Sequence, residues 1–242
     1  MPRHPFFDTT QPLIFAHRGG AALAPENTLA AFDRGLACGA DGIELDVRWS
    51  ADGVVVVHHD ATLDRTTALR GPLVAQSASA LLAAGVPSLA DVLQRYPRAR
   101  VIVELKLNDP AFGRAVVDVV RAHGAVDRVC LGGFGRTVLR ACRAVAPELA
   151  TSAAREEVRM ALYRSWCRWP IAGAPYQGYQ VPEFAGRTRV VSPRFIADAH
   201  RAGLAVQVWT VNDDAQARRL LEWGVDAIIT DRPDAMVRLR SR

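Results

Sequence analysis

Acidic residues interrupt two stretches of this sequence that otherwise have the composition of buried strands. Residues 42–47 read Gly-Ile-Glu-Leu-Asp-Val, and residues 101–106 read Val-Ile-Val-Glu-Leu-Lys. Because residues two apart in a strand share a face, Glu44 and Asp46 are predicted to point the same way, roughly 6.6 Å apart. At an effective dielectric near ~20, carboxylates at that distance repel by on the order of 2.5 kcal/mol. The pair therefore needs a cation nearby.

A third carboxylate, Glu104, stands near the end of the second stretch. Three carboxylates with no cluster of cysteine or histidine beside them indicate a hard cation, Mg²⁺ or Ca²⁺, rather than zinc. The alternative is that arginines neutralise the carboxylates around a solvated rim. We favour the metal site.

Lys106 is the only lysine among thirty basic residues. A lysine kept where every other cation is arginine suggests a role that needs a compact ammonium on a flexible stem. Because Lys106 shares a face with Glu104, its ammonium could stabilise phosphate oxygens beside the metal or simply pair with that glutamate. The remaining alternative is that Lys106 is a lysine by chance and has no special role.

The sequence His17-Arg18-Gly19-Gly20 follows the first apolar stretch. Arg18 could hold a phosphate with a planar, bidentate grip, and the glycines allow the backbone to approach a ligand closely. A lone histidine in such a place is more often structural than catalytic. His17, however, is not alone, because His59-Asp60 and the acidic strands supply further polar groups.

Strand candidates alternate with helical patterns along the whole chain, with no linker or low-complexity tract. Strands are expected at residues 13–16, 42–47, 101–105, 129–132, 149–152, 177–181, 206–209 and 227–230. Helices are expected at 28–38, 88–95, 110–122, 137–146, 156–166, 193–202, 213–223 and 233–239. Eight such units in 242 residues predict an α/β fold, a (β/α)8 TIM barrel with its active site at the C-terminal strand ends. A doubly wound open sheet is the alternative.

Residues 49–85 interrupt this alternation after the second strand. They offer a turn at 51–53, a β-run at 54–58 and then polar, glycine-containing chain. An ordinary long loop would also fit, but the length favours a functional lid or subdomain over the barrel mouth. We predict one domain, 1–242, with 49–85 inserted within it.

Composition excludes several other classes of protein. With 50% hydrophobic and 23% charged residues, the chain can bury a large core. Its net charge of +5 comes from dispersed arginines, so nucleic acid is not an expected partner. The four cysteines lack CxxC spacing, which gives little support to zinc or disulfides. Residues 1–11 do not resemble a signal peptide and no apolar run suits a membrane span, so we expect a cytoplasmic protein without stable membrane association.

Motifs along nearly the whole chain resemble those of the glycerophosphodiester phosphodiesterase family. The matching segments are His17-Arg18-Gly19, Pro25-Glu26-Asn27-Thr28, residues 41–47, residues 59–67, Pro87-Ser88-Leu89, Glu104-Leu105-Lys106, residues 208–212, residues 224–226 and residues 230–233. Because so many segments match in the same order as in the family, a chance resemblance is negligible.

The resemblance implies a barrel with a small insertion after the second strand. It also implies a divalent metal held by Glu44, Asp46 and Glu104, and a pair of histidines, His17 and His59, for acid and base work. His58 precedes the matching histidine, but strand alternation sends it to the opposite face. His4, His123 and His200 fall on the tail or on helices.

Two aromatic residues complete the predicted site. Trp209 ends the seventh strand, where its ring could pack against glycerol or a bound alcohol, although core filling is the alternative. Phe134 matches the second position of a Ser-Phe dipeptide of the family, but Gly133 replaces the serine, which puts a hydrogen bond from that hydroxyl in doubt.

The activity implied is hydrolysis of a small-molecule glycerophosphodiester to glycerol 3-phosphate and an alcohol, with Arg18 and Lys106 on the phosphate. The alternatives are a lysophospholipase D-like enzyme, an aldolase that uses Lys106 as a Schiff base, and a catalytically silent binding module. The sequence leaves open the substrate, the metal, the roles of the two histidines, the attacking oxygen and the oligomeric state.

Residues 163–179 are the part of the chain least like the family, with several aromatics among prolines and glycines. These rings could shape specificity for a lipid headgroup or touch a membrane surface. We favour the third possibility, that Trp166, Trp169, Tyr176 and Tyr179 close the outer side of the barrel.

Overall fold

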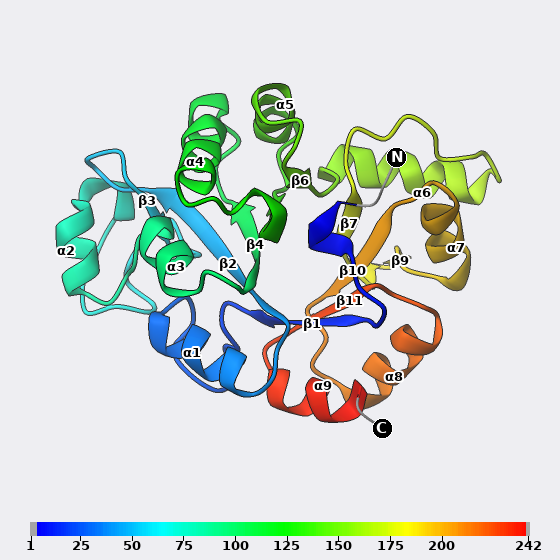
Figure 1. Ribbon diagram of the computed structural model, residues 1–242, viewed down its shortest axis with the longest axis horizontal. Helices are drawn as coiled ribbons and strands as arrows, with labels where there is room; N and C mark the ends of the chain where they lie inside the picture. The colour runs from blue at the N-terminus through cyan, green and yellow to red at the C-terminus, as the bar shows by residue number, and fades with distance from the viewer. Residues whose placement is uncertain (1–3, 241–242) are drawn as a thin grey trace.

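The computed structural model describes residues 4–240, and its centre is a ring of parallel strands (Figure 1). The ring consists of β1 (Leu13–His17), β2 (Gly42–Trp49), β4 (Arg100–Leu105), β5 (Val129–Gly132), β6 (Ala150–Thr151), β7 (Gly178–Pro182), β10 (Ala205–Trp209) and β11 (Ala227–Thr230). Hydrogen bonds join them in the order β6, β5, β4, β2, β1, β11, β10, β7. Neighbours in the ring are thus successive barrel strands in the chain.

The two ends of this sheet, β6 and β7, meet through bonds just outside the strands. Ser152 forms a parallel bridge with Gly178. The Gln177 N–H donates to the Thr151 carbonyl at 3.0 Å, and the Ala153 N–H donates to the Gly178 carbonyl at 2.9 Å. The sheet is therefore a nearly closed barrel, which confirms the predicted TIM-barrel fold and excludes the open doubly wound sheet.

Helices surround the barrel within a residue or two of the predicted bounds. They are α1 (Leu29–Ala37), α3 (Leu89–Arg95), α4 (Pro110–Ala122), α5 (Arg136–Val145), α6 (Arg155–Trp166), α7 (Pro193–Arg201), α8 (Asp214–Glu222) and α9 (Pro233–Arg240). Most begin where the sequence offers a cap. Thr28, for example, accepts a hydrogen bond from the Ala31 N–H, and Ser192 accepts one from the Phe195 N–H.

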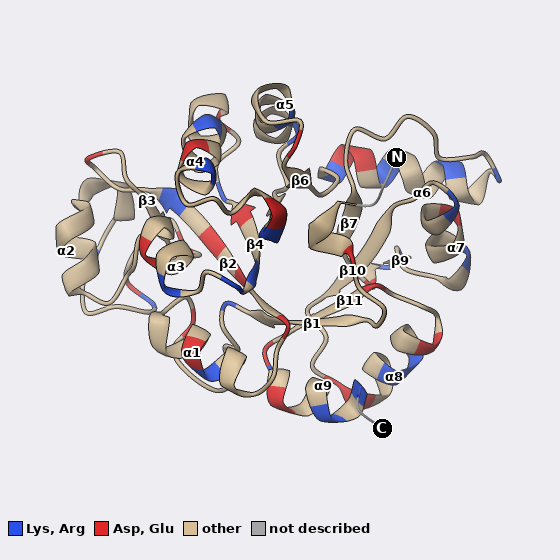
Figure 2. Ribbon diagram, in the orientation of Figure 1, with Lys and Arg blue, Asp and Glu red and all other residues tan. Residues whose placement is uncertain are grey.

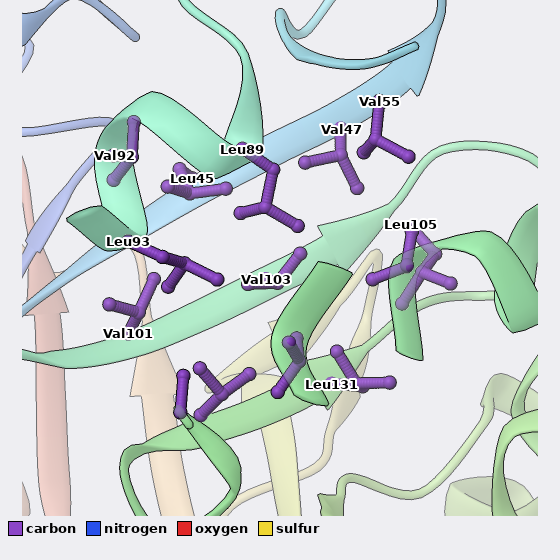
Figure 3. Close-up of a cluster of buried hydrophobic side chains, with 14 of the residues drawn as sticks. Leu45, Val47, Val55, Leu89, Val92, Leu93, Val101, Val103, Leu105 and Leu131 are labelled. Carbon is purple, nitrogen blue, oxygen red and sulfur yellow. The ribbon is translucent and has the colours of Figure 1, made fainter. Parts of the chain in front are cut away.

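Alternation along each strand decides which side chains enter the barrel. In β2, Ile43, Leu45 and Val47 point outward and pack under the helices, with Leu45 and Val47 near Leu89 of α3 (Figure 3). Their neighbours Glu44 and Asp46 must then point inward. The floor of the barrel is apolar, and it includes Phe6 of the short helix η1 (Pro5–Phe7), which stacks on Phe15 at 5.7 Å.

Residues 49–85 form a small unit beside the end of β2 (Figure 1). Its strand β3 (Val55–Val57) pairs antiparallel with β2, and η2 (Leu73–Ala75) and α2 (Ala78–Ala83) follow. The sequence did not predict α2. Val56, Leu63, Leu73 and Leu81 of this unit form a separate apolar cluster, which Val86, the next residue after the unit, completes. Its role as a lid, and the single-domain assignment of 1–242, stay predictions.

The remaining elements are η3 (Val126–Arg128) and a two-stranded hairpin after β7, formed by β8 (Phe184–Ala185) and β9 (Thr188–Arg189). None of the helices in residues 4–240 has the length and apolar character needed to cross a membrane.

The aromatic residues of 163–179 divide into two groups. Tyr176 and Tyr179 are buried, and the Tyr179 ring lies 5.0 Å from that of Phe195. Tyr163, Trp166 and Trp169 are 52%, 52% and 67% exposed. Tyr176 and Tyr179 can therefore close the outer side of the barrel, and the expectation was wrong for Trp166 and Trp169.

Candidate active site

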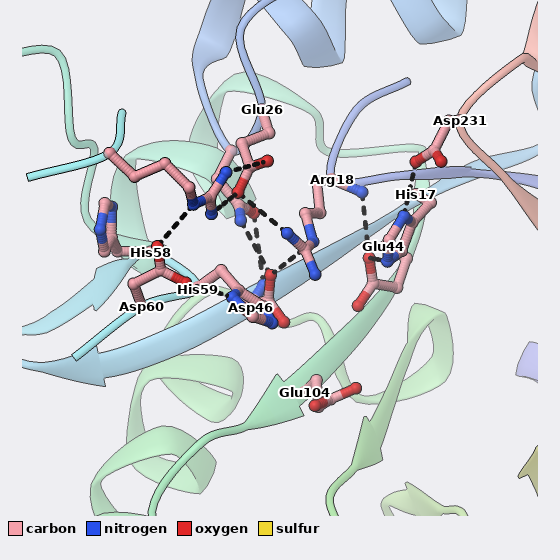
Figure 4. Close-up of polar contacts among 12 residues, drawn as sticks. His17, Arg18, Glu26, Glu44, Asp46, His58, His59, Asp60, Glu104 and Asp231 are labelled. Atoms are coloured by element: carbon pink, nitrogen blue, oxygen red, sulfur yellow. Dashed lines mark hydrogen bonds and ion pairs between the residues drawn. The ribbon is translucent and has the colours of Figure 1, made fainter. Parts of the chain in front are cut away.

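The polar strand ends meet at the C-terminal end of the barrel (Figure 4). Strand register brings them together, since His17 of β1 lies beside Glu44 of β2, and Asp46 of β2 lies beside Glu104 of β4. Glu44, Asp46 and Glu104 each offer a carboxylate oxygen, and these oxygens lie within 4.8 Å of one another. Alternation and register together thus assemble the predicted acidic cluster.

Burial makes the charge on these carboxylates costly. Glu44 is 4% exposed and Asp46 is 1% exposed. Burial, followed by repulsion from Asp46, raises the pKa of Glu44 to about 8. Burial also acts to raise the pKa of Asp46, but the Lys106 ammonium and the Asn27 amide outweigh it and lower that pKa. Three oxygen donors under such mutual repulsion fit a hard divalent cation, which would stabilise all three in the ionised form.

Lys106 reaches into the acidic cluster. Its Nζ lies 2.5 Å from Glu104 Oε1 and 2.8 Å from Asp46 Oδ1. Burial alone would lower the pKa of Lys106, but the two carboxylates raise it. The Lys106 side chain is therefore a positively charged ammonium that Asp46 and Glu104 hold in place.

Asp231 orients the ring of His17. The His17 Nδ1–H donates to Asp231 Oδ1 at 2.7 Å, and Nε2 lies 3.9 Å from Glu44 Oε2. Burial lowers the pKa of His17, but Glu44 and Asp231 overcome that effect and raise it. In the neutral form, Nε2 is the nitrogen that remains free to exchange a proton.

His59 has the same arrangement on the other side of the carboxylates. Its Nδ1–H donates to Asp60 Oδ1 at 2.6 Å, and Arg65 holds Asp60 through a 2.7 Å bond from Nε. His58 points away, with Nε2 3.1 Å from the Thr62 carbonyl oxygen, and does not line the cavity. The prediction that His58 is a bystander is consistent with this placement.

Arg18 follows β1 with a positive φ of 51°. Its backbone N–H donates to Glu44 Oε2 at 3.0 Å, and its Nη1 donates to Glu26 Oε1 at 3.0 Å. Nε makes no hydrogen bond, although it lies 3.4 Å from Asp46 Oδ2. The neighbouring Gly19 is required for this turn, because its φ is 89° and a Cβ there would lie 2.7 Å from that of Ala31.

All of the predicted site residues line one cavity of about 390 Å³. Its polar end holds His17, Arg18, Glu44, Asp46, His59, Glu104 and Lys106. At the opposite end, the rings of Phe134 and Trp209 meet edge to face with centroids 6.1 Å apart. Val158, Val181 and Val190 continue that wall, and His4, His123 and His200 do not reach the cavity.

Several supporting residues were not predicted as part of the site. The buried Asn27 donates from Nδ2 to Asp46 Oδ2 at 2.8 Å, and Asp231 and Asp60 hold the two histidines. Asn212 donates in turn to Asp231 Oδ2 at 2.7 Å. Each belongs to a motif of the sequence, but only the fold shows which side chain it positions. Arg155, at the start of α6, also lines the cavity and lay in no motif.

Comparison with known proteins identifies the fold and the family. Residues 17–235 match the model of the glycerophosphoryl diester phosphodiesterase family. The chain belongs to this family. The predicted family and the predicted enzyme class, a glycerophosphodiester phosphodiesterase, are therefore confirmed.

Two relatives match nearly the whole length of this family member. "Uncharacterized protein YqiK" of Bacillus subtilis is 34% identical, over 91% of this chain and 95% of its own. A glycerophosphodiester phosphodiesterase of Caldanaerobacter subterraneus is 29% identical, over 94% of this chain and 97% of its own.

Solved structures agree with the fold. A glycerophosphodiester phosphodiesterase from Agrobacterium tumefaciens has a TM-score of 0.76 and 34% identity, covering 94% of this chain and 100% of its own. A phosphodiesterase from Oleispira antarctica, in complex with the product sn-glycerol-3-phosphate, has a TM-score of 0.77 and 25% identity, covering 96% of this chain and 98% of its own.

Proposed function

We propose that the protein hydrolyses glycerophosphodiesters to glycerol 3-phosphate and an alcohol, with a divalent metal and two histidines. The observation that carries the proposal is the acidic cluster flanked by His17 and His59, each held at Nδ1 by an aspartate. The family match and the product complex of the Oleispira enzyme support it. The cytoplasmic location stays a prediction from the sequence.

Glu44, Asp46 and Glu104 would hold the metal, Mg²⁺ or Ca²⁺ by their all-oxygen donor set. When bound, the ion would supply positive charge against the phosphoryl oxygens, where negative charge develops. The residues that surround the cluster have separate roles.

Arg18 and Lys106 are the protein's own cations for the phosphodiester. The side chains of Arg18 and Lys106 both line the cavity beside the carboxylates. A phosphodiester carries one negative charge, which spreads over its non-bridging oxygens as the attacking oxygen approaches. Fixed cations at that position lower the barrier because they need no reorganisation during the reaction.

His17 and His59 would move the protons. One Nε2 takes the proton from the attacking oxygen, a water or the neighbouring glycerol hydroxyl, and the other donates to the departing alkoxide. The Nδ1–H bonds to Asp231 and Asp60 fix the tautomer that leaves Nε2 available. Each transfer typically contributes ~10² to 10⁴ in rate.

The electrostatics of Lys106 argue against the aldolase alternative. A Schiff-base lysine needs a lowered pKa so that its amine is neutral and nucleophilic. The carboxylates of Asp46 and Glu104 raise the pKa of Lys106 instead. A silent binding module is also disfavoured, because both histidines and all three carboxylates are present.

Lysophospholipase D-like activity is a second candidate, and the apolar wall of the cavity favours it. Val158, Val181 and Val190 extend from the Phe134–Trp209 pair, and an acyl chain could lie against them. Glycerophosphodiesters without an acyl chain would leave this wall unused.

The deciding experiment measures release of glycerol 3-phosphate from glycerophosphocholine, with and without EDTA, and after Mg²⁺, Ca²⁺ or Mn²⁺ is returned. The His17→Ala variant is assayed in parallel with His200→Ala, whose surface histidine also pairs with an aspartate, at 2.8 Å, but lies outside the cavity. Activity that survives both chelation and His17→Ala would contradict the mechanism. A panel that includes lysophospholipids separates the two candidate functions.

A further inference from the structure

An apolar surface on α6 and the turn after it has no role in the hydrolysis. Met160, Tyr163, Trp166 and Trp169 are between 52% and 67% exposed. Most other exposed large apolar side chains in residues 4–240 lie singly or in pairs on separate elements. The concentration of four within ten residues therefore marks one surface rather than ordinary scatter.

These side chains are not needed for packing of the helix. Ala161, Leu162 and Ser165 form the buried side of α6, whereas Tyr163 and Trp166 contact each other on the outer side with ring centroids 5.5 Å apart. Two tryptophans exposed without a structural role carry an energetic cost in water. Such exposure is typical of a surface that binds a partner.

Basic residues dominate the charge of the same surface, although Glu156 and Glu157 of the first helical turn lie beside Met160 and Tyr163. No acidic residue occurs from 158 to 182. Arg159, Arg164 and Arg168 make no ion pair and no side-chain hydrogen bond with other residues of the described chain. In Figure 2, the acidic positions of α6 are confined to its first turn, and basic positions continue into the following turn.

We propose that the exposed side chains of residues 159–169, here called the α6 surface, bind reversibly to membranes rich in anionic phospholipid. Tryptophan and tyrosine favour the boundary between headgroups and acyl chains, where their rings are buried and their polar edges stay hydrated. Free arginines beside them complement the negative surface of such a membrane. The contact is peripheral, and it replaces the expectation of no stable membrane association with reversible binding.

The proposal is tested by co-sedimentation of the full chain with vesicles of phosphatidylcholine alone or mixed with phosphatidylglycerol. We expect binding to the anionic vesicles only. A Trp166→Ser, Trp169→Ser variant should lose it, together with a blue shift of tryptophan emission on vesicle addition. An Arg164→Gln, Arg168→Gln variant should bind roughly thirtyfold more weakly.

Matched controls separate a specific surface from general stickiness. Val74→Ser with Leu82→Ser removes two apolar side chains of similar exposure, 59% and 54%, from the insertion. Arg98→Gln with Arg218→Gln removes the same charge from other exposed places. Both controls should bind as the parent does, and equal loss in controls and α6 variants would reject the α6 surface as the binding site.

Two other results would overturn the proposal. One is absence of binding to anionic vesicles. The other is a concentration-dependent dimer, seen by sedimentation velocity, that the tryptophan variant abolishes, because the α6 surface would then bind a second copy of the chain. Hydrolysis of water-soluble glycerophosphocholine should be the same in all these variants, so failure of the proposed activity is read separately from failure of membrane binding.

Discussion

Asp231 accepts a 2.7 Å hydrogen bond from His17 Nδ1–H, although 214 residues separate the two in the chain. Pairing of β1 with β11 creates the contact, because Ala16 lies beside Thr230, and His17 and Asp231 are the residues that follow them. The bond fixes which nitrogen of His17 faces the reaction. Asp231 is therefore a positioning residue for the histidine.

Asp231→Asn should lower kcat on the order of 100-fold, because the amide no longer selects the productive tautomer. It should also move the pH profile. Asp231 contributes to the raised pKa of His17, so its removal lowers that pKa, and the limb of the kcat/KM profile assigned to His17 shifts to lower pH. Asp234→Asn, on the nearby surface, is the control. A loss of rate with an unshifted profile would mean that Asp231 acts only on structure.

Removal of His17 or His59 should reveal their separate roles. His17→Ala and His59→Ala should each reduce kcat by about 10² to 10⁴ on glycerophosphocholine. A substrate that releases p-nitrophenol needs no proton on its leaving group, so the variant that lacks the general acid should recover most of its rate. The variant that lacks the base should stay slow. Recovery in both or in neither would contradict a division into one acid and one base.

Chelation should abolish activity and also lower thermal stability. The ion that we propose binds only the folded chain, so saturating Mg²⁺ or Ca²⁺ should raise the Tm by mass action. Glu44→Gln should lose this rise, and its metal-free Tm at neutral pH should stay close to that of the parent, because a pKa of about 8 leaves most of the Glu44 carboxyl neutral there, like the amide. Calorimetry checks both, with Glu148→Gln as a surface control. A metal-induced rise that persists in Glu44→Gln would place the ion elsewhere.

Much of this fold and site could be predicted because it depends on short-range patterns. Apolar Ile43, Leu45 and Val47 define the outward face of β2, and this alone turns Glu44 and Asp46 into the barrel. The roles of Asn27 and Asp231 depend instead on how distant loops pack at the barrel mouth. No local sequence pattern encodes that packing. The motifs that contain Asn27 and Asp231 therefore mark these residues in the sequence but do not show which side chains they contact.

The aromatic segment shows the same limit. Trp166 and Tyr179 have similar neighbours in sequence, rich in aromatics and small residues, yet one is exposed and the other is buried against Phe195. Because α6 carries apolar residues on both sides, its sequence does not reveal which side meets the barrel.

Lys106 should be irreplaceable by arginine. Its Nζ lies within 2.8 Å of both Asp46 and Glu104, a place that suits a compact ammonium better than a planar guanidinium. We expect Lys106→Met and Lys106→Arg each to lower kcat by about 10² to 10³, as loss of a preorganised cation does. Borohydride with a carbonyl substrate should trap no adduct on the parent protein, and near-normal activity of Lys106→Arg would show that only charge matters there.

Arg155 should influence which alcohol the enzyme releases. It is exposed at the start of α6, lines the cavity near the Phe134–Trp209 pair, and makes no ion pair within residues 4–240. A cation there disfavours a cationic leaving group such as choline over a neutral one such as inositol. Arg155→Glu should raise the ratio of kcat/KM for glycerophosphocholine over glycerophosphoinositol by about three- to tenfold, because one reversed charge acts across partly hydrated space. Arg140→Gln, on the neighbouring helix, should leave the ratio unchanged. If the ratio stays constant in Arg155→Glu while both substrates are hydrolysed, Arg155 does not contact the alcohol and the apolar wall alone sets the preference.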